Sequence, residues 1–405
     1  MAAGLLNRVL GADLPGQARG PLVSIGINFA ALSVFATFFG LWLVGPLGAN
    51  AQQVSTGYFA AGMAGIAGGY LGGRLTDRFG PRPVIFSGSG LQVVLATSLF
   101  IPGIGVGPAC AVLVAMTFLQ PLRGVAQRIA LADAGPESAR DELFAGYRLV
   151  VNLGSILGPA LGAGMVGISW TALHLEVAVL YVLSFLFSLG LRTGAQPQRH
   201  PGQPRSLMTA AIFTDWRLYA LMFATTSAWT VVYTYETVLP VALTQSYGLS
   251  PTEWGLVYAL GPVLVVLFQL RVTRWITAVR ADLRLAAGTA LMGAAFLVMV
   301  LGGALWLVVI LVIVFVVGDM MWGPASEVAT LRVAPPHQRG AYVGVLTSAI
   351  WLGSALAPAI GFPLREQLGD NALWGAVLVL GLVSGAAYVA TDFFASRTVK
   401  RESSW

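Results

Sequence analysis

Apolar runs of about 20 residues, the length that spans a bilayer, alternate with short polar breaks along the chain. We count twelve such runs, centred near residues 34, 63, 93, 117, 155, 181, 230, 261, 292, 318, 350 and 384. They lack the period-two alternation of membrane barrel strands. Because only helices and closed barrels satisfy their backbone in lipid, the pattern predicts an all-α integral membrane protein with twelve transmembrane helices.

The composition excludes an ordinary soluble protein. Only 10% of the 405 residues are charged and the mean hydropathy is +0.78, whereas soluble proteins carry about 25% charged residues. The net charge is +6, and the arginines and lysines that contribute to it, Arg123 among them, fall on the side of the membrane that holds the N-terminus, whereas only Arg365 lies clearly on the other side. The positive-inside rule then places both termini in the cytoplasm and makes a nucleic-acid partner unnecessary.

The N-terminus and the cysteine content set two further expectations. Residues 1–20 show no cleavable signal, and the first apolar run is long enough to remain as a helix. The single cysteine, Cys110, excludes an internal disulfide framework and a multi-cysteine metal site. We expect no metal and no cofactor.

The chain divides into two related halves. The longest hydrophilic break, residues 191–216, splits the runs six and six, which predicts an N-terminal bundle (1–192), a linker (193–215) and a C-terminal bundle (216–405). A shift of 199 residues aligns NLGSILGPALG (152–162) with WLGSALAPAIG (351–361), and seven of eleven positions agree. Two parallel six-helix halves are typical of secondary transporters with a substrate site near the midplane between them.

A short charged break follows the second run. Its pattern, Gly73-x-Leu75-x-Asp77-Arg78-x-Gly80-x-Arg82, resembles the signature loop of the major facilitator superfamily. The resemblance in overall plan extends over nearly the whole chain, and it implies that these residues form a conformational latch. Gly73 would allow close helix approach, and Asp77 would brace the start of span 11 near residues 339–342. Pro81 and Pro83 depart from the usual pattern, and the alternative is an ordinary charged loop.

Span 5 contains a second motif of small residues. Gly154, Gly158, Pro159 and Gly162 resemble the motif associated with antiporters of the same superfamily, with Ala145 and Ala163 where glycines are expected. The three glycines share one helix face, so another helix can approach closely, and Pro159 can bend the helix. The alternative is small-residue packing with no bearing on the direction of transport.

A proton-coupled antiporter needs a group that exchanges protons within the membrane, and carboxylates are the usual choice. Asp319 lies halfway along span 10 in VVGDMMWGP, which resembles span 10 of several multidrug proton antiporters. Glu236 and Glu176 are further candidates nearer the ends of spans 7 and 6. The alternatives are a structural acid at Asp319, and carboxylates at Glu236 and Glu176 that simply reach water.

The residues that contact the substrate are less legible. Arg148 and Asn152 resemble an arginine and asparagine pair in span 5 of related transporters and can hold an anionic group. Snorkelling to the cytoplasm and bridging to Asp133 are the alternatives for Arg148. Aromatic side chains suit planar, apolar or cationic compounds, unless they face lipid. The aromatic candidates are Phe38, Trp42, Trp229, Tyr233, Trp322 and Trp351.

The resemblance implies a proton-coupled exporter that works by alternating access, most like the multidrug efflux proteins that confer antibiotic resistance. We expect its partners to be protons, a small-molecule substrate and the lipid bilayer, and we expect a monomer in the bacterial inner (plasma) membrane. A metabolite carrier for a sugar, amino acid or lipid-like solute is the alternative. A membrane enzyme is the remote one, because the chain lacks recognisable catalytic motifs and its histidines are scattered.

Overall fold

The computed structural model describes residues 16–134, 140–190, 216–276, 278–333 and 339–402. All regular secondary structure in these ranges is helical, and each predicted apolar centre lies within a helix, so the all-α prediction is confirmed. Nine helices in these ranges are long and apolar enough to cross a membrane. The helices α3, α4 and α8 do not meet that criterion, and the count of twelve spans stays a prediction.

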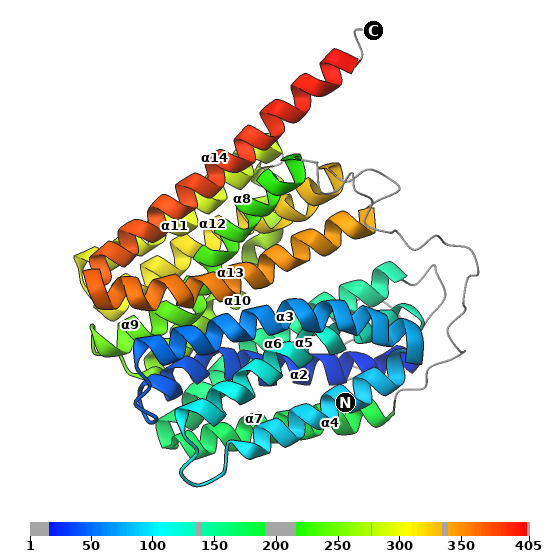
Figure 1. Ribbon diagram of the computed structural model, residues 1–405, viewed down its shortest axis with the longest axis vertical. Coiled ribbons are helices and arrows are strands. Elements are labelled where there is room, and N and C mark those ends of the chain that lie inside the picture. Colours follow the sequence, from blue (N-terminus) through cyan, green and yellow to red (C-terminus); the bar gives the residue numbers. More distant parts are fainter. Residues whose placement is uncertain (1–15, 135–139, 191–215, 277, 334–338, 403–405) are drawn as a thin grey trace. The chain divides into compact units, whose positions relative to one another are not determined.

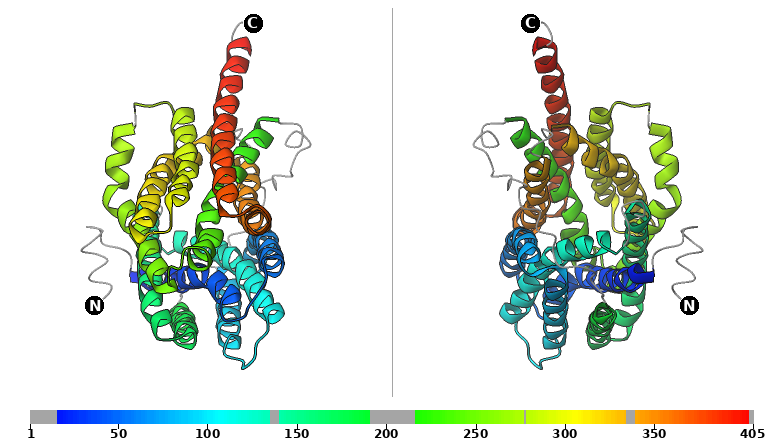
Figure 2. Two further views of the ribbon diagram at one scale, coloured as in Figure 1. Left: turned by 90° about the vertical axis from the view of Figure 1, so that its left-hand side faces the viewer. Right: turned by 90° about the vertical axis from the view of Figure 1, so that its right-hand side faces the viewer.

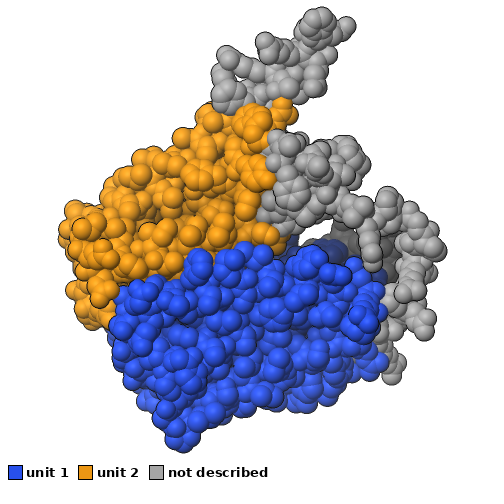
Figure 3. Space-filling view, viewed as in Figure 1, with its two compact units in different colours: residues 1–200, 250–262 blue, residues 201–249, 263–405 orange. Residues whose placement is uncertain are grey.

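The chain forms two compact units, which Figure 3 colours separately. Unit 1 comprises residues 1–200 and 250–262, and unit 2 comprises residues 201–249 and 263–405. The helix α10 (Pro251–Ile276) is therefore divided between the units, whereas the sequence placed it wholly in the second half. The predicted linker, residues 193–215, lies outside the described residues.

Unit 1 is a bundle of long helices that lie side by side in Figures 1 and 2. Helix α2 packs against α6 and α7, helix α5 against α3 and α4, and helix α4 against α7. Their bounds are α2 (Gly16–Val44), α3 (Ala51–Phe79), α4 (Pro81–Ser98), α5 (Val106–Ala132), α6 (Arg140–Ile168) and α7 (Trp170–Leu189).

Unit 2 is built in the same way. Helix α8 packs against α13 and α14, and helix α11 packs against α12 and α14. Besides its part of α10, the unit contains α8 (Trp216–Tyr233), the π-helix η3 (Thr234–Val238), α9 (Leu239–Gln245), α11 (Ala281–Ala295), the 3₁₀-helix η4 (Phe296–Leu301), α12 (Leu305–Val333), α13 (Arg339–Leu368) and α14 (Asp370–Glu402).

Four internal helix pairings recur in the two units. Under the 199-residue shift, α2, α4, α5, α6 and α7 correspond to α8, α11, α12, α13 and α14. The pairs α2–α6, α2–α7, α4–α5 and α4–α7 recur as α8–α13, α8–α14, α11–α12 and α11–α14. The shared pairings support the internal duplication that the sequence indicates.

Polar caps set where two helices of unit 1 begin. Asn50 precedes α3, where its side chain accepts a hydrogen bond from the Gln53 backbone (2.9 Å) and the Gln53 side chain accepts one from the Asn50 backbone (3.0 Å). Ser169 precedes α7 and accepts a hydrogen bond from the Ala172 backbone (3.0 Å). Such caps satisfy backbone N–H groups that the first turn of a helix leaves free.

Candidate transport site

Two of the predicted carboxylates lie around one tyrosine in unit 2. Glu236 is on η3 and Asp319 is on α12, and the Tyr235 side chain is within electrostatic range of both. The Tyr235 ring stacks on Phe315, one turn before Asp319, with centroids 4.3 Å apart and planes at 11°. This contact fixes α12 against η3 at the level of the two acids.

Asp319 is partly exposed and makes no hydrogen bond or ion pair to another described residue. An added Cβ at Gly323, one turn on, would lie 4.0 Å from the Asp319 carboxylate. A structural acid held by a neighbouring helix would show such a partner. Within the described part of the chain, the alternative that Asp319 is a structural acid therefore gains no support.

The π-helix places Glu236 in an irregular turn. Pro240 has no N–H to donate to the Glu236 carbonyl, and its ring would collide with that carbonyl in a regular α-helix. The wider turns of η3, over residues 234–238, accommodate this conflict. Single π-turns are frequent at functional sites, so the irregular backbone adds to the interest of Glu236.

Aromatic side chains gather close to Asp319. Trp322, three residues further on α12, is buried, and its Nε1 donates to the Tyr388 hydroxyl (3.2 Å). That hydroxyl also lies 3.2 Å from the Thr225 hydroxyl. Trp229 meets Trp322 edge to face, with centroids 5.4 Å apart, and Tyr233 lies next to Trp229 at 5.8 Å. Trp229, Tyr233 and Trp322 therefore form one aromatic cluster.

Tyr388 was not among the residues singled out from the sequence. It lies in the apolar run of α14, where nothing in the pattern distinguishes it from the surrounding residues. The one feature that could have drawn attention to it is its hydroxyl group within an apolar helix, because a tyrosine hydroxyl needs a hydrogen-bond partner when it is buried. Trp351, which was singled out, is partly buried on α13, and no ring contact links it to the aromatic cluster among the described residues.

The aromatic candidates of unit 1 are packed into its interior. Phe38 is fully buried, and its ring fills the space over Gly162, where an added Cβ would lie 2.8 Å from Cε2. Trp42 meets His174 edge to face at 4.5 Å. These contacts are those of packed core residues, and a role for either ring in substrate binding stays a prediction.

The polar candidates of unit 1 differ in their surroundings. Both carboxylate oxygens of Glu176 are buried and have no hydrogen-bond partner among the described residues. Arg148 is exposed on α6 and Asn152 is partly exposed one turn further. The burial of Glu176 argues against a carboxylate that simply reaches water.

The charged break of the sequence is a single-residue turn between α3 and α4. Gly80 has a φ of 82°, a conformation that favours glycine, and Pro81 occupies the first turn of α4, where a missing N–H costs nothing. An added Cβ at Gly73 would meet no described atom within 4 Å, whereas one at Gly72 would lie 2.6 Å from the Leu122 backbone. Among the described residues, Gly72 rather than Gly73 gives the close helix approach.

The partners expected for Asp77, the side chains of residues 339–342, lie outside the described residues. Arg78 and Arg82 are exposed on either side of Gly80. The latch stays a prediction.

The glycines of the span 5 motif hold α6 against α2. An added Cβ would lie 2.5 Å from the Gly26 carbonyl at Gly154 and 2.5 Å from the Ala30 carbonyl at Gly158. Pro159 is buried in the same helix. The motif therefore serves close packing within unit 1, and its association with antiport stays a prediction.

A buried polar group in unit 1 was underestimated from the sequence. Arg123, counted with the loop arginines, is 1% exposed inside α5, and its Nη1 donates to the Ser89 hydroxyl (2.9 Å). The Nε and Nη2 atoms have no partner among the described residues. The repeated polar positions Gln120, Arg123 and Gln127 on one face of α5 were the available signal.

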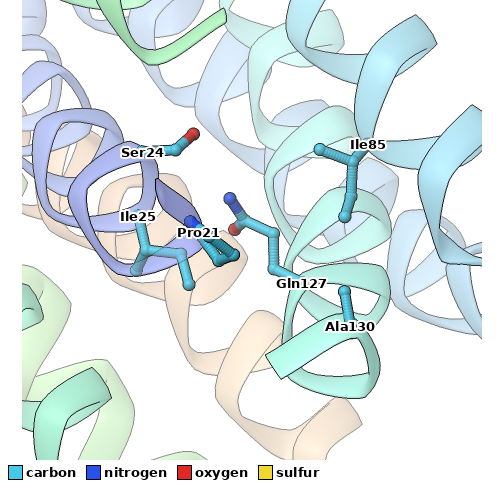
Figure 4. A pocket seen from close by; sticks show the side chains of 6 residues that line it. All are labelled: Pro21, Ser24, Ile25, Ile85, Gln127 and Ala130. Carbon is cyan, nitrogen blue, oxygen red and sulfur yellow. The ribbon is translucent and has the colours of Figure 1, made fainter. Parts of the chain in front are cut away.

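One turn after Arg123, the same face of α5 borders a small pocket. Gln127 and Ser24 line it, and Figure 4 shows both side chains at the wall of the pocket. The other lining residues are Pro21, Ile25, Ile85 and Ala130. Its volume of about 10 Å³ is close to the space of one water, so the pocket is too small for an organic substrate. The described residues contain no cluster of three or more His, Cys, Asp or Glu suited to a metal ion.

The comparisons with known proteins agree with one another on the fold. The Major Facilitator Superfamily model matches residues 22–358. An uncharacterized MFS-type transporter of Mycobacterium tuberculosis (strain ATCC 25618 / H37Rv) is 26% identical over 94% of this chain and 94% of its own length. The multidrug resistance protein MdtH of Salmonella typhimurium is 23% identical over 93% of this chain and 96% of its own length.

Solved structures resemble the whole chain at low sequence identity. A variant of the nucleoside transporter NupG has a TM-score of 0.80 at 15% identity, covering 93% of this chain and 100% of that one. The peptide transporter POT in complex with sulfate has a TM-score of 0.76 at 18% identity, covering 93% of this chain and 95% of that one. At these identities the likeness concerns the fold alone.

Proposed function

The chain belongs to the major facilitator superfamily, and we propose that it exports small lipophilic or aromatic compounds by proton antiport. In this proposal Asp319 binds the coupling proton, Glu236 assists it, and the aromatic cluster of Trp229, Tyr233 and Trp322 contacts the substrate. The cycle is one of alternating access in the inner membrane.

The observation that carries the proposal is the position of Asp319 in unit 2. It lies within electrostatic range of Tyr235, which Glu236 also reaches, and it has no hydrogen-bond partner among the described residues. An unpaired acid in a membrane helix is costly unless it binds a proton or a cation. Either ligand suits an exchanger, because protonation and cation binding then compete for one carboxylate.

The aromatic cluster supports the substrate class. Trp229 and Tyr233 are partly exposed, next to the buried Trp322. Aromatic faces attract organic cations and stack on flat rings. The similarity to MdtH, which is named for multidrug resistance, favours the same class.

A metabolite carrier is the second candidate. The solved structures that resemble this chain include a nucleoside transporter and a peptide transporter. Glu236 and Asp319 can serve such a carrier equally well as hydrogen-bond acceptors for hydroxyl or amine groups. The two candidates differ in what moves with the substrate and in which direction.

The test is substrate-driven proton movement in proteoliposomes, followed with an internal pH-sensitive dye. Ethidium and chloramphenicol serve as the lipophilic compounds, and uridine and a dipeptide represent the metabolite classes. We expect ethidium to move protons through the wild type and not through Asp319→Asn. Glu366→Gln, an exposed acid on α13, is the matched control and should couple normally. Transport without proton movement, or normal coupling in Asp319→Asn, would overturn the proposal.

A further inference from the structure

An apolar groove lies between α3 and α4, with α5 as its floor, on the outer surface of unit 1. Its volume is about 330 Å³. Phe79 and Leu91 on its walls are 54% and 46% exposed, whereas Leu119 and Leu122 of the floor are buried. The lining residues are Leu75, Phe79, Pro83, Val84, Ser87, Gly88, Leu91, Leu119 and Leu122.

The groove follows from the turn at Gly80. Helices α3 and α4 are joined by this one residue and both pack on α5, so a wedge remains between them. Gly88 deepens the wedge because it has no side chain, and the aliphatic stem of Arg123 lies directly behind it, 3.5 Å from where a Cβ would be. In a bundle that crosses the membrane, an exposed apolar groove of this kind is suited to lipid chains.

Positive charge gathers at the end of the groove where the two helices join. Arg78 and Arg82 flank Gly80, and both are exposed. The Arg78 guanidinium lies 5.0 Å from the ring centre of Phe79, which is a wall of the groove, and that of Arg82 lies 5.7 Å from the ring of Phe86. With Arg74 and the single acid Asp77, the turn carries a net charge of +2 (three arginines less one aspartate).

The Gly80 turn therefore places two arginine guanidinium groups, those of Arg78 and Arg82, at the end of the apolar groove. A phospholipid has the complementary shape, since its acyl chain is apolar and its phosphate accepts bidentate hydrogen bonds from arginine. The acyl chain alone gives the lipid little preference for the groove over the bilayer, because the chain leaves one apolar environment for another. Selectivity must come from the headgroup, where the arginines repel the amine of a zwitterionic lipid and favour a net negative one.

We propose that this groove binds one anionic phospholipid, with an acyl chain between α3 and α4 and its phosphate at Arg78 and Arg82. The leaflet is the one that holds the Gly80 turn. The site lies wholly within unit 1, and it does not depend on which compound the protein transports.

The test is native mass spectrometry of the full chain, delipidated in detergent and then titrated with phosphatidylglycerol or phosphatidylcholine of identical acyl chains. We expect the wild type to bind the first phosphatidylglycerol about tenfold more tightly than phosphatidylcholine. Arg78→Gln/Arg82→Gln should remove this preference. Arg19→Gln, an exposed arginine at the start of α2 in the same unit, should retain it.

A third variant tests the apolar part of the site. Ser87→Phe adds a ring within the groove and should weaken binding of both lipids, while the Arg78→Gln/Arg82→Gln protein should still bind both of them equally. Circular dichroism and gel filtration establish that each variant is folded. A preference that survives Arg78→Gln/Arg82→Gln, or is lost equally in Arg19→Gln, overturns the proposal. Unchanged lipid binding in Ser87→Phe also overturns it.

Discussion

Gly154 of α6 lies against the backbone of Ala30 in α2, so closely that an added Cβ would be 2.9 Å from the Ala30 nitrogen. Gly353 of α13 stands in the corresponding place in unit 2, where an added Cβ would lie 2.6 Å from the Cβ of Trp229. Gly353 follows Gly154 by 199 residues, and Trp229 follows Ala30 by the same number. The internal repeat therefore preserves a helix contact as well as a sequence pattern.

Replacing Gly154 with leucine should destabilise unit 1. The new side chain would overlap the α2 backbone, which cannot move as a flexible side chain can, and overpacking of this kind costs about 1–3 kcal/mol. Gly164 on the same helix has no described atom within 4 Å of its Cβ position and is exposed, so Gly164→Leu is the matched control. The measurement is the thermal unfolding midpoint of the protein in detergent.

The comparison of Gly154→Leu with Gly164→Leu also bears on the antiporter motif. If Gly154→Leu unfolds at the same temperature as Gly164→Leu but loses transport, the glycine serves the transport cycle rather than packing. Equal stability with normal transport in both variants would contradict the observed contact.

The helical architecture was predictable because each predicted span shows the same signal, an apolar run of about 20 residues. The glycine face of α6 could also be read correctly, since positions four apart share a face. The burial of Arg123 could not be predicted as easily, because an arginine near the end of an apolar run can either snorkel or turn inward. Pro240 carried a readable signal for an irregular turn, but the particular choice of a π-helix depends on tertiary packing.

Asp319 and Glu236 should not contribute independently to proton coupling. Both act on Tyr235, so removal of one changes the surroundings of the other. We expect Asp319→Asn to abolish substrate-driven proton movement and Glu236→Gln to weaken it about tenfold. The double variant should be no worse than Asp319→Asn alone. Proton uptake per substrate in proteoliposomes gives all three values. Residual proton movement in Asp319→Asn that Glu236→Gln lowers further would show that the two acids contribute independently.

Glu176 allows a stability test that is independent of transport. Its carboxylate oxygens are buried without a partner in the described part of unit 1, and an unpaired buried charge is costly. Glu176→Gln keeps the shape and removes the charge, so its unfolding midpoint at pH 8 should equal or exceed that of the wild type. A marked loss of stability would mean that the carboxylate has a partner, and normal stability with lost coupling would give Glu176 a proton-binding role.

Tyr388 should hold Trp322 in place. Its hydroxyl accepts from the Trp322 indole and also lies within hydrogen-bond distance of Thr225. Tyr388→Phe keeps the ring and leaves the indole N–H unpaired, at a cost of about 1–3 kcal/mol. Ethidium affinity, measured by fluorescence, should fall if the aromatic cluster binds it. Thr225→Val, which removes only the outer partner, should have a smaller effect, and the reverse order would contradict this arrangement.

Arg365 ties the end of α9 to the turn between α13 and α14, and each guanidinium nitrogen has its own partner. Nε donates to Asp370 (2.6 Å), Nη1 to Gln245 (2.7 Å) and Nη2 to Ser246 (2.9 Å). A lysine keeps the charge but lacks the fork, so Arg365→Lys should retain the ion pair and lose the link to α9. We expect it to cost about 1–2 kcal/mol, since the contacts are partly exposed. Arg365→Gln, which also leaves Asp370 without its cation, should cost more.

Thermal unfolding in detergent at low and high salt separates the two losses, because only the ion pair is screened by salt. If Arg365→Lys unfolds like the wild type, the contacts to Gln245 and Ser246 add no stability, and the ion pair alone secures this end of unit 2.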